Sequence, residues 1–541
     1  MNISTKSFRD YVDNEIVTED NAISQNRQEY YPIYNIVEGN NRNANPVIQP
    51  WMYIECLKNL GFQRMDVGNK SFLIRIDENV IEEVSDRDVL DGLVGYLKSF
   101  PNGVLPDGLD YKIVLNKVYH QIGKYTGKLL ERLNTDPNLR IQDDSKEKVY
   151  FYYQNGFVEV TKSDIKLMPY SYLKGKIWRG QILPREFKVI KSNEQNNWAR
   201  FVRNIANNWK VRWYDTNQNS SPNPEREKQL KQIIGYALHG YFDGKLKAIV
   251  LTDSRMEDEA SGRSGKTLLI KGIGHMLNSN EYSKTFVEVN GKDFKPDDKF
   301  KWQELGLETK LVHLNDCQAN FDFEQLFNDI TEGFKSQHKQ KSPFKVLAKL
   351  FLSSNRTIRL NGESAKDRSL EFELADYYSA DHGPDQEFGQ WFFSDWTNEE
   401  WLQFDNYMIQ CCQLYLENGL EVPDTINLEA RKLQEETSLD FVEFMNDVIE
   451  YENPELLKRY EWLCHNEKAT TSLKDEFCDI FPEYNNRKFT TTKFNTWLEI
   501  FSKYHPGLIY RKKAAAIRKS SGKRLFSFQA KLKCSAKFSN K

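Results

Sequence analysis

The stretch DEASGRSGKTLLIKGI, residues 258–273, decides how the centre of this chain is interpreted. It follows LKAIVLTD, an aliphatic run that predicts a buried strand, and it continues into apolar spacing that predicts a helix. Gly265, Lys266 and Thr267 match the end of the phosphate-binding pattern GxxxxGK(S/T), which lies between a strand and a helix. Backbone N–H groups at the helix start would face phosphates, the Lys266 ammonium would reach them, and the Thr267 hydroxyl would bind Mg²⁺.

One position departs from that pattern. The first glycine should stand at residue 260, where the chain has Ala260, and Gly262 follows two residues later. The alternative interpretation is a glycine-rich turn that carries a surface lysine. The predicted nucleotide-binding residues are Gly262, Ser264, Gly265, Lys266 and Thr267.

Polar side chains end two further predicted strands, TKLVHLNDC and KVLAKLFLSSN. The first contains Asn315 and Asp316, the second ends in Asn355, and FDFEQLFNDITEGF between them predicts a helix. Strands that alternate with helices indicate a parallel sheet covered by helices. Because nucleotide hydrolysis needs an acid near Mg²⁺ and the attacking water, we predict that Asp316 is catalytic, that it shares Mg²⁺ with Thr267, and that Asn355 assists.

The set GRSGKT, LVHLND, LFLSSN and ESAKDRSLEFEL resembles the ATPase core of superfamily 3 helicases, of the primase-helicase type found in phages, plasmids and mobile elements. The resemblance is specific over about residues 245–420 and weaker elsewhere. It implies an AAA+ P-loop fold that assembles as a homo-hexameric ring around one nucleic-acid strand. ATP and Mg²⁺ would be held between neighbouring subunits.

The resemblance also implies roles for single residues. Asp316 would be the acid of the second motif, Asn355 a polar sensor, and Arg368 the arginine finger that reaches the next subunit's site. Arg356 and Arg359 are rivals for the finger, and a surface salt bridge is the alternative role for Arg368. The family usually has a second acid where this chain has Asn315, so hydrolysis would be slow if Asn315 takes the place of the catalytic acid.

The charge of the chain is segregated. Residues 487–541 contain fifteen Lys or Arg against one acid, a net charge of +14, which leaves −17 on the rest of a chain whose total is −3. This segregation predicts a module that binds a polyanion such as DNA, attached to an acidic body. A solvated basic tail is the alternative.

Two basic segments are candidates for DNA contact. GFKSQHKQKSPF lies between the second and third motifs, where the resembled helicases have a hairpin that points into the central channel. Near the C-terminus, two predicted helices precede LIYRKK and RLFSFQ, two predicted strands around a lysine-rich loop, which is the order of a winged helix. The aromatic residues of the second helix have core spacing rather than base-stacking spacing. The predicted DNA-binding residues are His338, Lys339, Lys341, Arg511, Lys512, Lys513, Lys519 and Arg524.

The whole chain therefore predicts an α/β and α+β multidomain protein. We expect an accessory domain with a polar arm over residues 1–100, an α+β domain with a hairpin over 101–195, and a helical collar over 196–244. The AAA+ ATPase would occupy residues 245–425, and a helical plus basic winged-helix-like domain residues 426–541.

Composition excludes several classes of protein. The 541 residues are 39% hydrophobic and 28% charged, which is typical of folded soluble chains. We expect no membrane association, because no stretch is long and apolar enough to span a bilayer and the N-terminus does not resemble a signal peptide. The seven scattered cysteines predict neither disulfides nor a zinc site. Primases of the resembled family have paired acids that bind two metal ions. Asp77 and Glu78 are candidates here but lack a second acidic cluster and a histidine, so primase activity is not expected.

These observations predict an ATP-dependent DNA helicase of phage or mobile-element replication, located in the bacterial or phage-infected cytoplasm. Its partners would be single-stranded or forked DNA, further copies of itself and replication proteins. One alternative is a DNA-binding AAA+ switch, an initiator or defence protein that binds nucleotide without unwinding DNA. Another is a kinase or metabolic enzyme that shares only the phosphate loop.

Overall fold

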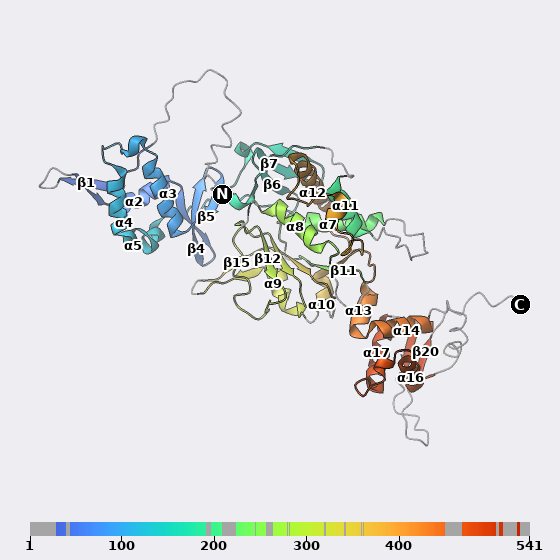
Figure 1. Ribbon diagram of the computed structural model, residues 1–541. Helices are drawn as coiled ribbons and strands as arrows, with labels where there is room; N and C mark the ends of the chain where they lie inside the picture. Colours follow the sequence, from blue (N-terminus) through green and yellow to red (C-terminus); the bar gives the residue numbers. More distant parts are fainter. Residues whose placement is uncertain are drawn as a thin grey trace.

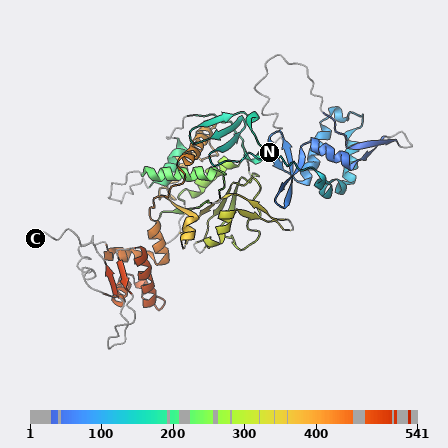
Figure 2. The ribbon, with the colours of Figure 1, turned by 180° about the vertical axis from the view of Figure 1, so that it is seen from behind.

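The computed structural model describes residues 29–38, 44–190, 196–207, 223–243, 245–255, 263–278, 280, 282–318, 321–339, 342–358, 360, 362–449, 468–504, 508–511 and 527–530. Figures 1 and 2 show a central part, with the N-terminal part on one side of it and the C-terminal part on the other. The expected mixed α/β organisation in several domains is confirmed.

The N-terminal part joins a two-stranded ribbon to a group of helices. Its elements are β1 (Tyr34–Glu38), β2 (Ala44–Ile48), α2 (Pro50–Asn59), α3 (Asp86–Lys98), η1 (Pro101–Gly103), α4 (Tyr111–His120), α5 (Ile122–Tyr125) and η2 (Gly127–Arg132). One buried apolar cluster runs from Ile33 to Leu133. The packing therefore crosses residue 100, where the sequence predicts a domain boundary.

A four-stranded sheet connects this part to the centre of the molecule. Its order is β3-β4-β5-β9, with β3 (Phe62–Val67), β4 (Lys70–Asp77), β5 (Val80–Glu83) and β9 (Ile177–Trp178). Phe72, Ile74, Ile81 and Trp178 belong to a buried cluster shared with the central part. The ring of Phe72 meets that of Phe344 edge-on at 5.1 Å between centroids, so the two parts are joined by apolar packing.

A second four-stranded sheet contains the predicted Asn-Gly hairpin. Its order is β10-β6-β7-β8, with β6 (Val149–Tyr153), β7 (Gly156–Val160), β8 (Ile165–Met168) and β10 (Ile182–Leu183). Strands β6 and β7 are antiparallel around Asn155 and Gly156, which confirms the hairpin. Two short 3-10 turns, η3 (Tyr170–Tyr172) and η4 (Arg179–Gln181), flank β9.

The central part is built on a five-stranded sheet in which every neighbouring pair is parallel. Its order is β12-β13-β16-β11-β17, with β11 (Ala248–Asp253), β12 (Phe286–Asn290), β13 (Leu311–Asn315), β16 (Lys349–Ser353) and β17 (Ser369–Leu374). Along β11, Ile249 and Leu251 enter one buried cluster, whereas Ala248 and Val250 enter another. The sheet is thus covered on both faces, as parallel sheets require, and the predicted parallel sheet is confirmed.

Helices from distant segments cover one face of this sheet. They are α6 (Asn197–Ala206), α7 (Pro224–Leu238), α8 (Lys266–Leu277) and α12 (Asn398–Asn418), which share the larger cluster. Helices α7 and α12 approach so closely that a Cβ on Gly235 would stand 2.1 Å from the Cys411 carbonyl oxygen. The other face packs against η5 (Phe323–Leu326), α9 (Phe327–Glu332) and α10 (Gly362–Asp367). The short α11 (Pro384–Phe388) precedes α12.

The predicted single strand KVLAKLFLSSN is wrong in one respect, because the chain divides it into two strands. Strand β15 (Phe344–Val346) pairs antiparallel with β14 (Phe334–Ser336) as a separate ribbon, whereas β16 lies in the central sheet. Leu347 and Ala348 separate the two strands. A hairpin between the second and third motifs is therefore present at the predicted place.

The C-terminal part is a helical unit with a small antiparallel sheet in the order β18-β20-β19. Its elements are α13 (Leu428–Glu436), α14 (Leu439–Ile449), β18 (Lys468–Ala469), α16 (Thr470–Ile480), η6 (Pro482–Tyr484), α17 (Thr491–Tyr504), β19 (Leu508–Arg511) and β20 (Ser527–Ala530). Phe494, Trp497 and Phe501 are buried in one cluster, which confirms their predicted role in the core. Among the described residues, none of the helices has the length and apolarity needed to cross a bilayer.

Candidate functional site

A cavity of about 630 Å³ lies at the carboxyl edge of the central sheet. Strands β11, β16 and β13 are neighbours and parallel, so the loops that follow them meet there, where open α/β sheets place their ligands. The structure brings six of the predicted residues together around this cavity. They are Ser264, Gly265, Lys266, Thr267, Asp316 and Asn355. Gly262 lies outside the described residues.

The start of α8 has the geometry of an anion site. Gly265 caps the helix in the left-handed conformation, with a φ of 99°, and no side chain caps the first amides. A Cβ at this position would also stand 3.0 Å from a methyl carbon of Ile205. Only glycine meets both requirements, and the uncapped N–H groups remain available to a phosphate.

The Lys266 ammonium is held inside the cavity by a carboxylate. Its side chain is buried, it forms an ion pair with Asp253 at the end of β11, and the Ser264 hydroxyl lies 3.4 Å away. Burial lowers the pKa of Lys266, and the Asp253 carboxylate opposes that change. Sequence reasoning missed Asp253, although an acid at the end of the strand before the loop was visible. A phosphate entering the cavity would compete with Asp253 for the ammonium.

Asp316 stands in a strained conformation at the end of β13. Its φ of 59° is left-handed, a region that non-glycine residues enter mainly where the surrounding structure imposes it, as at functional sites. The Asn355 side-chain amide donates to Asp316 Oδ1 at 3.4 Å, and Lys292 Nζ lies 2.7 Å from Oδ2. The predicted acid and sensor are therefore in contact.

Asn315 lines the same cavity as Asp316, and its side chain is hydrogen-bonded in a polar network between strands. Its amide donates to Glu288 Oε1 at 3.2 Å, and its carbonyl oxygen accepts from Ser353 Oγ at 3.1 Å. His313 lies 3.0 Å from Glu288 Oε2 and 2.9 Å from Ser353 Oγ. The hydrogen bond from His313 is the largest cause of the lowered pKa of Glu288. An acid in place of Asn315 would face this carboxylate, which gives a physical reason for the departure from the helicase pattern.

The donors at the cavity fit a magnesium ion. Mg²⁺ is usually bound through one or two protein oxygens plus phosphates and water, and the Thr267 hydroxyl and Asp316 carboxylate both line the cavity. Among the described residues, no group of three or more His, Cys, Asp or Glu side chains could hold a metal ion. Thr267 and Asp316 would supply two oxygens, and phosphates and water would fill the other positions that Mg²⁺ requires.

The far wall of the cavity was not predicted from the sequence. It comes from the segment around α11 and includes Ser379, Asp385, Gln386 and Trp391. Trp391 is 65% exposed, whereas most of the neighbouring aromatic rings pack around Trp198. A large exposed ring at the rim of a polar cavity is an available stacking surface.

Arg368 lies at the opposite edge of the sheet from this cavity. Its carbonyl accepts from the Ala248 amide at the start of β11, and the length of β11 separates Ala248 from Asp253 by roughly 17 Å. The guanidinium lies 4.9 Å above the Phe327 ring. Arg368 cannot reach the cavity of its own chain. Arg356 follows Asn355 in the chain, and Arg359 lies outside the described residues.

The β14–β15 ribbon carries two lysines that are not among the predicted DNA-binding residues. Lys335 and Lys345 are directly opposite each other, and both are exposed. Like charges opposite each other on a ribbon are unfavourable without a counter-charge. His338 and Lys339 follow β14, and Lys341 lies outside the described residues.

Most of the predicted C-terminal contacts are not described. Arg511 ends β19, and Lys512, Lys513, Lys519 and Arg524 lie outside the described residues. Of the residues described in and just before α17, four exposed ones carry a positive charge: Arg487, Lys488, Lys493 and Lys503.

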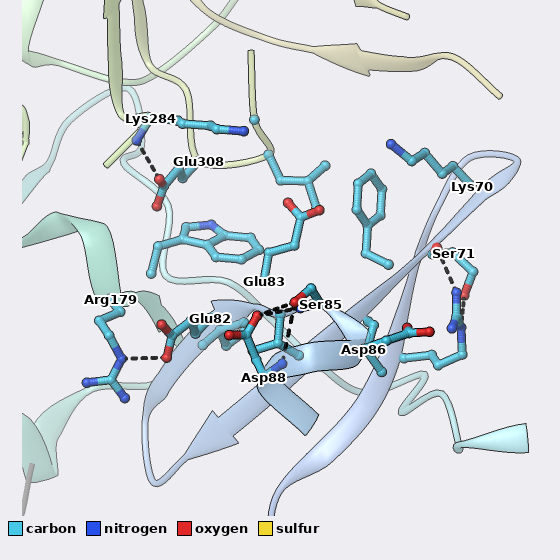
Figure 3. A pocket seen from close by; sticks show the side chains of 18 of the residues that line it. Lys70, Ser71, Glu82, Glu83, Ser85, Asp86, Asp88, Arg179, Lys284 and Glu308 are labelled. Atoms are coloured by element: carbon cyan, nitrogen blue, oxygen red, sulfur yellow. Dashed lines mark hydrogen bonds and ion pairs between the residues drawn. The ribbon is translucent and has the colours of Figure 1, made fainter. Parts of the chain in front are cut away.

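A larger cavity, of about 1450 Å³, lies between the β3–β5 strands and the central part (Figure 3). Its polar groups include both signs, and several are paired: Arg179 Nε lies 2.9 Å from Glu82 Oε2, and the Glu308 carboxylate accepts from the Lys284 amide at 2.6 Å. Burial, with a further contribution from Glu83 and Glu82, raises the pKa of Glu308. This mixture of charges does not form a basic path for nucleic acid.

Comparison with known proteins gives structural neighbours only. No protein-family model and no curated protein matches the chain. Among solved structures it is similar to the apo structure of the NrS-1 C-terminal region (305–718), with 12% identity, a TM-score of 0.38 and coverage of 89% of this chain and 99% of that chain. An A form apo structure of the same region gives 12% identity, a TM-score of 0.39 and the same coverage. TM-scores this low do not establish a shared fold.

Replacing Asn315 by Asp tests the polar network. The new carboxylate would face Glu288, so we expect the free energy of unfolding of Asn315→Asp to fall by about 1–2 kcal/mol, the scale of an unsatisfied polar group. Adding Glu288→Gln should restore most of the loss, because an amide can donate to the new acid. Urea unfolding followed by tryptophan fluorescence measures both, with Glu288→Gln alone as the control. Wild-type stability of Asn315→Asp near neutral pH would contradict the network.

Proposed function

We propose that this chain is an ATP-driven motor of the superfamily 3 helicase type that moves along single-stranded DNA in phage or mobile-element replication. The observation that carries the proposal is the cavity in which the start of α8, Lys266, Asp316 and Asn355 meet at one edge of a parallel sheet. The adjacency of the strands that bear the phosphate loop, Asn355 and Asp316 supports an AAA+ fold for residues 245–425.

Different residues of the cavity would bind the phosphates, the base and the Mg²⁺ of ATP. The amides of α8 and the Lys266 ammonium bind the phosphates, while Trp391 offers a ring to the base. Thr267 and Asp316 would hold Mg²⁺, which when bound neutralises charge on the phosphate oxygens. Asp316 accepts a hydrogen bond from the attacking water, and Asn355 fixes the carboxylate through its amide.

The position of Arg368 supports a site shared between copies. A finger at the sheet edge opposite the cavity can act only on the nucleotide of a neighbouring subunit, where its charge would stabilise the transition state. A closed ring repeats such a head-to-tail contact around an axis. A homo-hexamer is the ring that the family resemblance implies.

Two features support DNA as the partner. Lys335 and Lys345 lie opposite each other on the β14–β15 ribbon, so a phosphate bound between them would relieve their mutual repulsion. In the C-terminal part, the element order helix, strand, helix, helix, strand, strand around one apolar core supports a winged helix with α17 in the recognition position.

The second candidate function is an ATP-binding switch that assembles on DNA without unwinding it. Asn315 is tied to Glu288, so β13 supplies one acid to the cavity instead of two. That observation favours slow turnover, with nucleotide binding itself as the signal.

Removing the Lys266 ammonium tests nucleotide binding. We expect Lys266→Ala to weaken binding of ATP with Mg²⁺ by up to about a hundredfold, because a hydrogen-bonded charge contact is worth up to about 3 kcal/mol. Titration of a fluorescent ATP analogue measures it. Lys271→Ala, on the exposed face of α8, is the control and should bind normally. Because Lys266→Ala leaves Asp253 unpaired, Lys266→Ala with Asp253→Asn is measured too, and ATP binding by that folded double variant would contradict the site.

Mixing two inactive variants tests the shared site. Arg368→Ala should bind ATP normally but hydrolyse it at least about a hundredfold more slowly. Loss of an arginine finger usually slows hydrolysis by about a thousandfold or more. Mixing it with Lys266→Ala should restore part of the turnover, because intact Lys266 and intact Arg368 then meet between different copies. Arg356→Ala, which changes the residue after Asn355, is the comparison. Turnover that stays at the level of the separate variants would contradict a finger acting between subunits.

The β14–β15 lysines predict a salt-dependent contact with DNA. Changing Lys335 and Lys345 to Ala should weaken binding of single-stranded oligonucleotides and reduce the slope of log affinity against log salt by about 1.4, at about 0.7 per phosphate contact. Fluorescence anisotropy measures both. The exposed Lys98 and Lys112, changed together in the N-terminal part, are the control. An unchanged slope would place the DNA path elsewhere.

A further inference from the structure

Helix α13 lies between the nucleotide cavity and the C-terminal part and makes polar contacts with the loops on the cavity side. Just before it, the Asn427 side chain donates to the Ser254 carbonyl, 2.8 Å away, on the segment that leads into the phosphate loop. Near its end, Glu435 accepts from the Thr357 amide at 2.7 Å. One short helix is thus bonded to the segments that follow both β11 and β16.

Arg431 makes the contact closest to the chemistry. One amino group of its guanidinium donates to the Asn355 carbonyl at 3.2 Å, while the Asn355 side chain bonds Asp316. Burial is the main cause of the lowered pKa of Lys266, and repulsion from the Arg431 charge lowers it further. The Arg431 side chain is 5% exposed, and its other amino group, buried, has no partner among the described residues. A buried cation with an unused donor beside a phosphate site is stabilised when negative charge arrives there.

The opposite side of α13 belongs to the C-terminal part. Leu433 is buried in the same cluster as Phe441, Phe494 and Trp497. At the helix end, the Tyr504 hydroxyl of α17 donates to Glu436 at 3.3 Å. A displacement of α13 therefore cannot occur without a change in the packing of α17.

We infer that α13 couples nucleotide occupancy to the C-terminal part, with Arg431 as the positioning residue. The inference rests on the nucleotide site proposed above. Binding of ATP with Mg²⁺ would place negative charge beside Lys266 and change the contact of Asp316 with the Asn355 side chain. A shift of Asn355 would then move α13, because Arg431 is hydrogen-bonded to the Asn355 carbonyl. Because such coupling is reciprocal, a ligand on the C-terminal part would change the affinity of the cavity by the same factor.

Hydrogen exchange of the full chain, with and without Mg²⁺ and the non-hydrolysable analogue AMP-PNP, tests this coupling. Slower exchange over residues 263–268 reports nucleotide binding, and slower exchange over α13 and α17 reports coupling. We expect both in the wild type, with exchange in α13 slowed at least about fivefold, the lower end of usual coupling factors. In Arg431→Gln, at a nucleotide concentration that saturates the variant, residues 263–268 should remain protected while α13 loses its response.

The outcomes separate the coupling from the nucleotide site. Protection of residues 263–268 without any response of α13 in the wild type overturns the coupling and leaves the proposed function standing. Absence of protection at residues 263–268 overturns both. Fast exchange of α13 in Arg431→Gln before nucleotide is added shows a merely structural role and also overturns the inference. Lys432→Gln removes the same charge from the same helix but contacts Glu371 on β17, so it should keep the response of α13.

Discussion

The neighbouring and parallel arrangement of β13, β16 and β11 is the constraint on which the rest of the molecule depends. Because their carboxyl ends share one edge, the phosphate loop, Asp316 and Asn355 meet without any long excursion of the chain. The sheet can hold this edge rigidly since both of its faces are buried, one under α8 and its neighbours and the other under α9 and α10. Strand order therefore determines which of the predicted site residues meet at the cavity, and the segment around α11 closes it on the other side.

The two edges of the sheet have different roles in this account. The carboxyl edge carries the cavity, the Lys266–Asp253 ion pair and the contacts of α13, whereas the opposite edge carries Arg368. The proposed nucleotide site and the proposed arginine finger of one copy thus lie at opposite edges of the sheet, as head-to-tail assembly would require. Helix α13 contacts both the segments at the first edge and the C-terminal part, so the proposed nucleotide binding, assembly and DNA contact would all depend on the same sheet.

The sequence predicted those parts of the site whose signals are local. The strand, loop and helix around Lys266, the strand that ends at Asp316, and the core spacing of Phe494 and Trp497 are patterns within short windows. Strands β12 and β17 were not identified because FVEVN and SLEFEL are short and interrupted by acids. Asp253, Glu288 and Arg431 act through partners that only the folded chain brings near, so no periodicity in the sequence could have paired them.

ATP turnover by the purified full chain, measured together with strand separation on forked DNA, tests the central claim most directly. The account predicts that ATP is hydrolysed, that single-stranded DNA increases the rate, and that the fork is opened only when ATP and Mg²⁺ are both present. Binding of ATP and DNA with no turnover and no strand separation would contradict a motor and leave the switch as the function of this cavity.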